Sequence, residues 1–179
     1  MKATGIVRRI DDLGRIVIPK EIRRTLRIRE GDPLEIFTDR EGKVILKKYS
    51  PIGELGTLAG IYADSLSKTL DCTVCITDTD QVIAAAGNGK KELQEMLLSA
   101  ELAEVFQQRK TVLTKSSDAE FVAITKDRSE YSEEIISVIL SEGDIAGGVI
   151  FLQKNEKKHF GEMEKKFASG VADLLGRQL

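Results

Sequence analysis

The N-terminal 48 residues constrain the fold of this chain most, because they carry several strand and turn signals in too short a segment to enclose a core. Gly5 to Ile10 alternates well enough for a strand, and Arg15 to Ile18 is a second run rich in β-branched residues. Asp11 to Gly14 between them is a turn, in which Gly14 can take a positive φ. A segment of this length buries too little surface to be comfortably stable alone. We therefore expect it to share its core with a partner chain.

A short helix and a hairpin follow the two predicted strands. Pro19 ends the second strand and suits the first turn of a helix, which we place at Lys20 to Leu26. Leu34 to Thr38 and Lys43 to Lys47 form a hairpin. The order strand, strand, helix, strand, strand leaves open sheet edges that another copy can close. Two interleaved copies would form one β-barrel with two-fold symmetry.

Charge divides the chain in the same place. The first 48 residues carry 13 Lys or Arg and eight Asp or Glu, a net charge of +5, whereas the rest carries 14 basic and 21 acidic residues, a net charge of −7. A short basic segment on an acidic remainder is typical of a polyanion-binding module attached to a domain of another kind. With 179 residues, of which 41% are hydrophobic, the chain suits two small domains, which we place at residues 1–50 and 51–179.

Composition also predicts the compartment. Two cysteines and the lack of a long apolar run near Met1 argue against a secreted, disulfide-bonded protein. The longest apolar stretch, Ile145 to Leu152, is far shorter than the roughly 20 residues that a membrane-spanning helix needs. We expect a soluble cytoplasmic protein without a membrane partner.

Residues 1–50 also resemble the DNA-binding domain of the AbrB-type transition-state regulators of spore-forming bacteria. Four runs carry the resemblance and cover most of the segment: Lys2 to Arg8, Asp12 to Pro19, Glu21 to Leu26 and Ile45 to Tyr49. The resemblance implies a swapped-hairpin β-barrel formed by two chains, binding to double-stranded DNA, and regulation of sporulation-stage genes as an activator or a repressor. We accordingly expect association with the nucleoid.

Five arginines are the predicted DNA contacts. The resemblance implies Arg8, Arg15, Arg23 and Arg24, and Arg9 stands where the family often has Lys, which keeps the charge. The guanidinium group of arginine is planar and carries several hydrogen-bond donors, which can bind phosphate oxygens and the edges of guanine bases. Because the segment has no long recognition helix, we expect sequence-tolerant binding through phosphate contacts and DNA deformability. The alternative is that these arginines only keep the surface soluble.

Residues 51–179 begin and end with predicted helices that carry narrow apolar stripes. Ser50 is suited to cap the first helix, with Pro51 at its first position. The stripes comprise Ile52, Leu55, Ala59, Tyr62, Leu66 and Thr69 in the first helix, and Phe160, Met163, Phe167, Val171 and Leu174 in the last. Both can cover the domain's own sheet, or they can also pack against a second subunit as a helical bundle. We favour the bundle, which together with paired N-terminal segments predicts a tetramer.

The region between these helices resembles a GAF domain. Strands are predicted at Cys72 to Thr77, Gln81 to Ala86, Phe121 to Thr125, Glu134 to Ile139 and Ile145 to Gln153, with a helix at Lys91 to Gln107. This order, together with Gly143 to Ile150, implies an α+β fold in which an antiparallel sheet has helices on one side. GAF relatives often bind a small molecule between the sheet and its covering loops. No binding motif is recognisable here, so the ligand and its residues stay unassigned and no cofactor is predicted.

Several short motifs favour structural roles over chemistry. Cys72 and Cys75 form a single pair, and residues three apart on a strand face opposite sides, which argues against a zinc or redox site. We expect Asp78 and Asp80 to form a turn and His159 to be an ordinary surface residue near the last helix. The sequence has no recognisable set of nucleophile, base and orienting group. We therefore predict neither a metal site nor an enzyme.

Two functional hypotheses follow from these patterns. In the first, the chain is a DNA-binding transcriptional regulator whose C-terminal domain assembles subunits and can sense a small molecule. In the second, it is a sensor or antitoxin-like protein whose basic segment binds a protein partner. Antitoxins with related swapped barrels usually carry a short tail, whereas residues 51–179 are long enough to enclose a core. We favour the first hypothesis.

Overall fold

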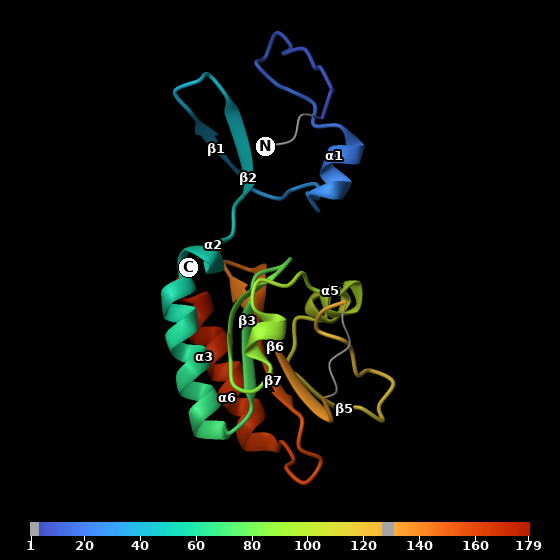
Figure 1. Cartoon of the computed structure of the whole chain (residues 1–179), viewed down its shortest axis with the longest axis vertical. Coiled ribbons are helices and arrows are strands. Elements are labelled where there is room, and N and C mark those ends of the chain that lie inside the picture. The colour runs from blue at the N-terminus through green and yellow to red at the C-terminus, as the bar shows by residue number, and fades with distance from the viewer. Residues whose placement is uncertain (1–3, 127–130) are drawn as a thin grey trace. The chain divides into compact units, whose positions relative to one another are not determined.

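Figure 1 shows the computed structural model of the chain, which describes residues 4–126 and 131–179. The chain divides into two compact units, one of residues up to Tyr49 and the other from Ser50 to Leu179. We call the first unit the head and the second the body.

The described residues of the head form one short helix and one hairpin, and both lie where the sequence predicts them. Helix α1 spans Lys20–Thr25, and strands β1 (Leu34–Thr38) and β2 (Val44–Lys48) pair antiparallel. The turn between the strands is held by Asp39, whose Oδ1 accepts hydrogen bonds from the backbone N–H groups of Glu41 and Lys43, both at 2.9 Å. Such a side-chain bond within a turn is a local interaction, which is why the sequence alone predicts this hairpin.

The two strands predicted at the start of the head are wrong for the single chain. Residues 5–10 and 15–18 are irregular, and the turn between them is closed by the Asp11 N–H, which donates to the Arg15 carbonyl at 3.1 Å, and by the Gly14 N–H, which donates to the Asp11 carbonyl at 3.0 Å. A β-strand needs a neighbouring strand for its backbone N–H and C=O groups. Within the described residues of one chain, neither segment has such a neighbour, so neither forms a strand.

The described part of the head has no core of its own. None of its described residues is buried, and many large apolar side chains are exposed. These are Ile6, Val7, Ile10, Leu13, Ile16, Val17, Leu26, Ile36, Phe37, Val44, Ile45 and Leu46. Water-exposed apolar surface of this extent is unfavourable for a unit standing alone. That a partner chain covers this surface stays a prediction.

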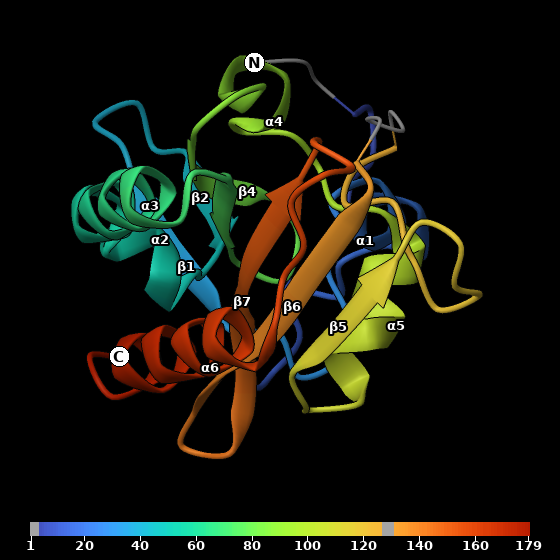
Figure 2. The same ribbon diagram turned by 90° about the horizontal axis from the view of Figure 1, so that it is seen from below.

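The body is built on a five-stranded antiparallel sheet with helices on both faces (Figure 2). Its strands are β3 (Thr73–Thr77), β4 (Val82–Ala86), β5 (Val112–Lys115), β6 (Glu133–Ser141) and β7 (Asp144–Gln153), in the spatial order β4-β3-β7-β6-β5. Its helices are α2 (Pro51–Glu54), α3 (Gly56–Leu70), α4 (Lys90–Leu93), α5 (Ala100–Gln107) and α6 (Glu162–Gly176). Helices α3 and α6 cover one face, whereas α4 and α5 cover the other. This arrangement corrects the prediction of helices on one side only.

The helix predicted at Lys91 to Gln107 is two helices, α4 and α5, separated by an extended segment. Gln94 explains the break, because its side chain binds the open edge of β4: Oε1 accepts the Ala85 N–H at 2.9 Å, and Nε2 donates to the Ile83 carbonyl at 2.8 Å. Ser99 then starts α5, since its hydroxyl accepts the Leu102 N–H at 3.0 Å. The apolar spacing alone could not reveal a side chain that protects a sheet edge.

The predicted strand at Phe121 to Thr125 is also wrong. This segment is irregular apart from one isolated bridge between Thr125 and Leu98. The strand beside β6 at that edge of the sheet is β5, which the sequence did not indicate. The strands predicted near β3, β4, β6 and β7 are confirmed, with boundaries shifted by at most two residues.

Two apolar clusters fill the body, one on each face of the sheet. Between the sheet and α3 and α6, the helices contribute mainly small residues such as Ala63, Ala168 and Ala172. Small residues let α6 approach closely: a Cβ atom at Gly176 would lie 2.1 Å from the Leu140 carbonyl oxygen on β6. On the other face, Phe106 and Leu102 of α5 pack over Ile136 and Ile150 of the sheet.

The two apolar stripes behave differently. Ile52 and Ala59 of the first stripe are buried in the body's own core, and Tyr62 and Leu66 pack against it. In the last stripe Phe160 is buried, but Met163, Phe167 and Leu174 are 61%, 46% and 41% exposed. The face of α6 that covers the sheet is formed instead by Ala168, Ala172 and Leu175. The first stripe therefore covers the domain's own sheet, whereas much of the last stripe faces away from it.

Among the described residues, no helix is long and apolar enough to cross a membrane.

Candidate nucleic-acid interface

Arg8, Arg9 and Arg15 flank the turn at the start of the head, and all three side chains are exposed. Asp11 organises this turn: its Oδ1 accepts the N–H groups of Leu13 at 3.0 Å and Arg15 at 2.8 Å, and its Oδ2 accepts Nε–H of Arg15 at 2.8 Å. The hydrogen bonds from the Arg15 backbone and side chain lower the pKa of Asp11 below its usual value. The carboxylate thus holds Arg15 beside the turn while that side chain remains 69% exposed.

Arg23 and Arg24 lie in the last turn of α1. Both are exposed, and the helix buries no residue of its own. Positive side chains near a helix C-terminus interact favourably with the helix dipole, so both arginines are compatible with a stable α1. Leu26, which the spacing predicts to face inward with Ile22, is 56% exposed in the single chain.

The five predicted arginines thus form two groups, one at the turn and one on α1. Nothing in the described part of the chain buries any of them. Their role as DNA contacts stays a prediction. Sequence reasoning placed Asp11 in the turn but missed its bonds with Arg15, although an Asp four residues before an Arg across a Gly-containing turn is a recognisable signal for them.

Cys72 and Cys75 lie on opposite faces of the sheet, as predicted. Cys72 packs in the cluster beneath α3 and α6, and Cys75 packs in the cluster beneath α4 and α5. Burial raises the pKa of each thiol to about 12, which disfavours the thiolate that metal binding and redox chemistry need. The described residues contain no group of three or more potential metal ligands.

Asp78 forms the predicted turn and also makes a contact that the sequence did not indicate. Its Oδ1 accepts the backbone N–H groups of Asp80 and Gln81, both at 2.7 Å. Its Oδ2 accepts the hydroxyl hydrogen of Ser50 at 2.9 Å. Ser50 also caps α2, as predicted, by accepting the Gly53 N–H at 3.0 Å.

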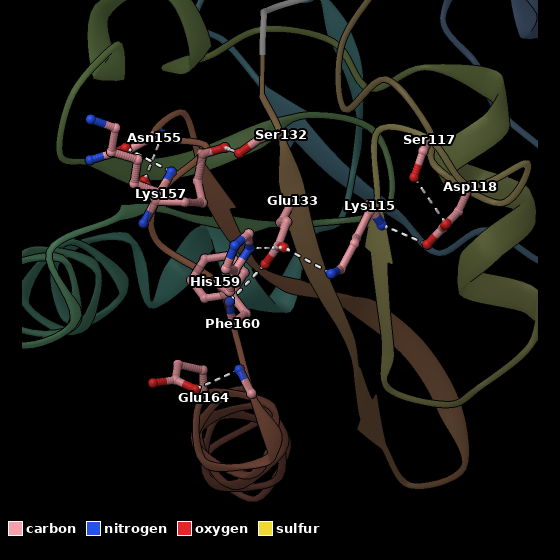
Figure 3. A network of polar contacts seen from close by, with 12 residues as sticks. Lys115, Ser117, Asp118, Ser132, Glu133, Asn155, Lys157, His159, Phe160 and Glu164 are labelled. Atoms are coloured by element: carbon pink, nitrogen blue, oxygen red, sulfur yellow. Dashed lines mark hydrogen bonds and ion pairs between the residues drawn. The ribbon is translucent and has the colours of Figure 1, made fainter.

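His159 is exposed near the start of α6, as predicted, but it belongs to a polar network around Glu133 (Figure 3). Oε1 of Glu133 lies 2.6 Å from Nδ1 of His159 and 3.6 Å from Nζ of Lys115, and Oε2 accepts the Phe160 N–H at 2.7 Å. Burial alone would raise the pKa of Glu133, but the bonds from Phe160 and His159 and the charges of His159 and Lys115 lower it. Glu133 therefore joins β6 to the start of α6 as a charged group.

Glu134, the next residue of β6, has the opposite environment. Its side chain is fully buried, and its Oε1 accepts hydrogen bonds from the Thr114 hydroxyl and the Val122 N–H, both at 2.9 Å. Its Oε2 has no hydrogen-bond partner within the described part of the chain. Burial outweighs the two bonds and raises the pKa of Glu134 to about 7. The pKa values of these two adjacent glutamates are thus shifted in opposite directions, because the side chains face different sides of the sheet and meet different partners.

An open groove of about 410 Å³ lies along β5, between residues of α5 and the segment that follows the strand. Its lining includes Gln108, Thr111 and Thr114, with Lys110 and Asp118 among its charged residues. No arrangement in it identifies a particular ligand, so a small-molecule ligand of the body stays a prediction.

The basic, exposed head and the sheet-and-helix body define a class: a nucleic-acid-binding regulator in which a small head is joined to a GAF-like domain. The body resembles the GAF domain of a phosphoenolpyruvate-protein phosphotransferase from Coxiella burnetii, with 20% identity and a TM-score of 0.54 over 69% of this chain and 80% of that one. At this identity the likeness shows the fold alone.

Sequence comparison places the chain within that class. Residues 54–179 match the family model of the stage V sporulation protein T C-terminal domain, described as a transcription factor. Over its full length the chain is 51% identical to stage V sporulation protein T of Bacillus subtilis (strain 168), covering 99% of that protein. The chain belongs to the stage V sporulation protein T family of transcriptional regulators.

The head has relatives of its own. Over 51 residues, 28% of this chain, it is 67% identical to the transition state regulatory protein AbrB of B. subtilis, covering 52% of that protein. Residues 7–54 also match the model of the MazE bacterial antitoxin, described as an antidote-toxin recognition family. The predicted combination of an AbrB-type head and a GAF-like body is confirmed. The pairing of two heads in one barrel stays a prediction.

Proposed function

We propose that this chain binds double-stranded DNA through Arg8, Arg9, Arg15, Arg23 and Arg24 and thereby regulates transcription of sporulation-stage genes. The observation that carries the proposal is the head itself: it has a net charge of +5, and all five arginines are exposed. Membership of a transcription factor family supports the same reading. Because the head is basic and the rest of the chain is acidic, a polyanion such as DNA is attracted to the head and repelled by the body.

A second copy of the chain completes the head in this proposal. The exposed apolar residues of the head and the two segments without a strand partner, 5–10 and 15–18, are what one half of a two-chain barrel would present. Pairing would bury the apolar residues and supply the missing backbone partners. It would also duplicate the five arginines about a two-fold axis, which matches the pseudo-symmetry of duplex DNA.

Binding in this proposal tolerates many sequences. Helix α1 has six residues, so it is about 9 Å long and too short to follow the major groove as a recognition helix. Arginines beside a turn and at the end of a short helix are suited to phosphate oxygens, which carry no sequence information directly. Selectivity would then come from the shape and deformability of the DNA.

The body supplies a second pairing surface. Met163, Phe167 and Leu174 lie on α6 at spacings of four and seven, and they are exposed on the side away from the sheet. Ile61 of α3 is also exposed, at 58%. Packing of these helices against another body would bury this apolar surface. Head pairing and body pairing between different neighbours give a tetramer with two head pairs, in a non-enzymatic protein of the cytoplasm and nucleoid.

The salt dependence of DNA binding tests the proposal. Because each phosphate neutralised adds about −0.9 to the slope of log K against log salt, and a head pair carries ten of these arginines, we expect a slope of about −4 or steeper on mixed-sequence duplex DNA. Fluorescence anisotropy titrations between 50 and 200 mM salt, roughly the range over which counterion release is measured, supply the slope. A slope near zero, or no binding at low salt, would contradict the proposal.

A second candidate, recognition of a protein partner by the basic head, is favoured by the match of residues 7–54 to an antitoxin family. That match ends within α2, whereas the body that follows is a folded domain and not a short tail. The same titration distinguishes the two candidates. A head that recognises a protein partner would bind DNA only weakly, and replacing any one of the five arginines would not reduce its DNA affinity.

A further inference from the structure

The two carboxylate oxygens of Asp11 bind different parts of the turn at residues 11–15. Its Oδ1 accepts the backbone N–H groups of Leu13 at 3.0 Å and Arg15 at 2.8 Å, which closes the turn. Its Oδ2 accepts the Nε–H of the Arg15 side chain at 2.8 Å. One oxygen therefore shapes the backbone, and the other holds the guanidinium group.

The β1–β2 turn closes in the same way with a different basic residue. Asp39 uses Oδ1 to accept the N–H groups two and four residues further along, those of Glu41 and Lys43, both at 2.9 Å. Gly14 and Gly42 occupy the same place in the two turns, with φ of 76° and 79°. Oδ2 of Asp39 lies 3.3 Å from Nζ of Lys43. Closing a turn of this kind therefore does not require a guanidinium group.

The bond to Asp11 uses the guanidinium nitrogen that is nearest the main chain. The two terminal nitrogens of Arg15 make no hydrogen bond within the described part of the chain. Their N–H groups can bind a phosphate oxygen or a guanine edge. The side chains of Arg15 and Asp11 are 69% and 37% exposed, and an ion pair this exposed contributes little to stability. The main effect of the bond is to restrict where the guanidinium group lies.

We propose that Asp11 is a positioning residue for DNA binding: its second carboxylate oxygen orients the guanidinium group of Arg15, so that this side chain loses less conformational entropy when it contacts DNA. The inference rests on the proposed function, in which Arg15 is a DNA contact. The negative charge of Asp11 acts in the opposite direction, because it repels phosphate groups. The test therefore has to separate orientation from charge.

Asp11→Asn removes the bond to the guanidinium group and keeps the turn. Asn retains an oxygen for the N–H groups of Leu13 and Arg15 and is well suited to such turns, but its NH2 group cannot accept the Nε–H of Arg15. Asp12→Asn is the matched control, since it removes the same charge from the same turn and leaves Asp11 in place.

Mobility of the Arg15 side chain is the first readout. NMR relaxation of its Nε–H group, in the full chain without DNA, gives an order parameter for this bond. We expect that order parameter to fall in Asp11→Asn and to stay at the wild-type value in Asp12→Asn. An equal order parameter in all three proteins would overturn the inference.

DNA affinity, from fluorescence anisotropy titrations of the full chain, is the second readout. We expect Asp11→Asn to bind duplex DNA at least about threefold more weakly than Asp12→Asn. In an Arg15→Ala background, Asp11→Asn should cause no further loss, because Asp11 acts through Arg15. Asp39→Asn, which removes the corresponding carboxylate of the β1–β2 turn, should bind DNA as the wild type does.

Each contrary result has a distinct meaning. Equal affinities of Asp11→Asn and Asp12→Asn would show that orientation of Arg15 does not aid binding. An equal loss with and without the Arg15 side chain, or an equal loss in Asp39→Asn, would assign the effect to the stability of the head. In these cases the inference fails, whereas DNA binding by the wild type upholds the proposed function. Failure of the wild type to bind DNA would instead reject the proposed function.

Discussion

Replacing Arg15 or Arg23 by Ala is expected to weaken binding to duplex DNA by about tenfold or more and to leave assembly unchanged. Each substitution occurs twice in a head pair, so it removes two phosphate contacts and makes the slope of log K against log salt less steep by about 2. Arg15 is 69% exposed and Arg23 lies on the exposed last turn of α1, so neither supports a core. Anisotropy titrations at two salt concentrations, with light scattering for the mass of the assembly, measure both quantities.

Arg40→Ala is the matched control for these variants. It removes the same charge from the same unit, but Arg40 lies in the β1–β2 turn and outside the runs that resemble the AbrB-type regulators. Its affinity should fall less than that of either variant, and its salt slope should stay close to that of the wild type. Equal losses in all three proteins would mean that only net charge matters. Unchanged affinity in Arg15→Ala and Arg23→Ala would reject the assignment of contacts.

Glu134→Gln is expected to stabilise the body at pH 8, by about 3 kcal/mol at most. The pKa of Glu134 is raised to about 7, so folding favours its protonated form. The stability that this proton confers is complete below the unfolded pKa, near 4.5, and is lost as the pH rises through about 7. Gln is neutral at every pH and keeps an oxygen for Thr114 and Val122. Urea unfolding at pH 5 and pH 8 should therefore show a gain at pH 8 that falls to less than about 1 kcal/mol near pH 5.

Glu133→Gln should act in the opposite direction. The pKa of Glu133 is lowered, so its charged form contributes stability above the unfolded pKa, and that contribution is lost as the pH falls through the folded pKa. Removing the charge should destabilise the body at pH 8, because the Phe160 N–H, His159 and Lys115 lose a charged acceptor. A Glu134→Gln variant that is less stable than the wild type at pH 8 would contradict the account of these two residues.

Features that depend on near neighbours in the chain were predictable from the sequence. The cap by Ser50, the β1–β2 hairpin and the turn formed by Asp78 each rest on a side chain that bonds backbone groups two to four residues away. Local chemistry of this kind is readable because its partners are adjacent in sequence.

Features that depend on distant partners were not predictable. The segments 5–10 and 15–18 carry strand signals, but the single chain offers them no strand to pair with. Gln94 interrupts a helical apolar pattern because its amide binds β4, about ten residues earlier. Glu133 and Glu134 carry carboxyl groups, yet both are buried, because β5, the segment after it and the segment before α6 supply partners that no local pattern reveals.

The most direct test of the central claim, that the head and not the body contacts DNA, is to cross-link the full chain to duplex DNA and to identify the attached peptides by mass spectrometry. The account predicts cross-links in the peptides that carry Arg8, Arg9, Arg15, Arg23 and Arg24. Cross-links that fall in residues 50–179 and spare the head would contradict it.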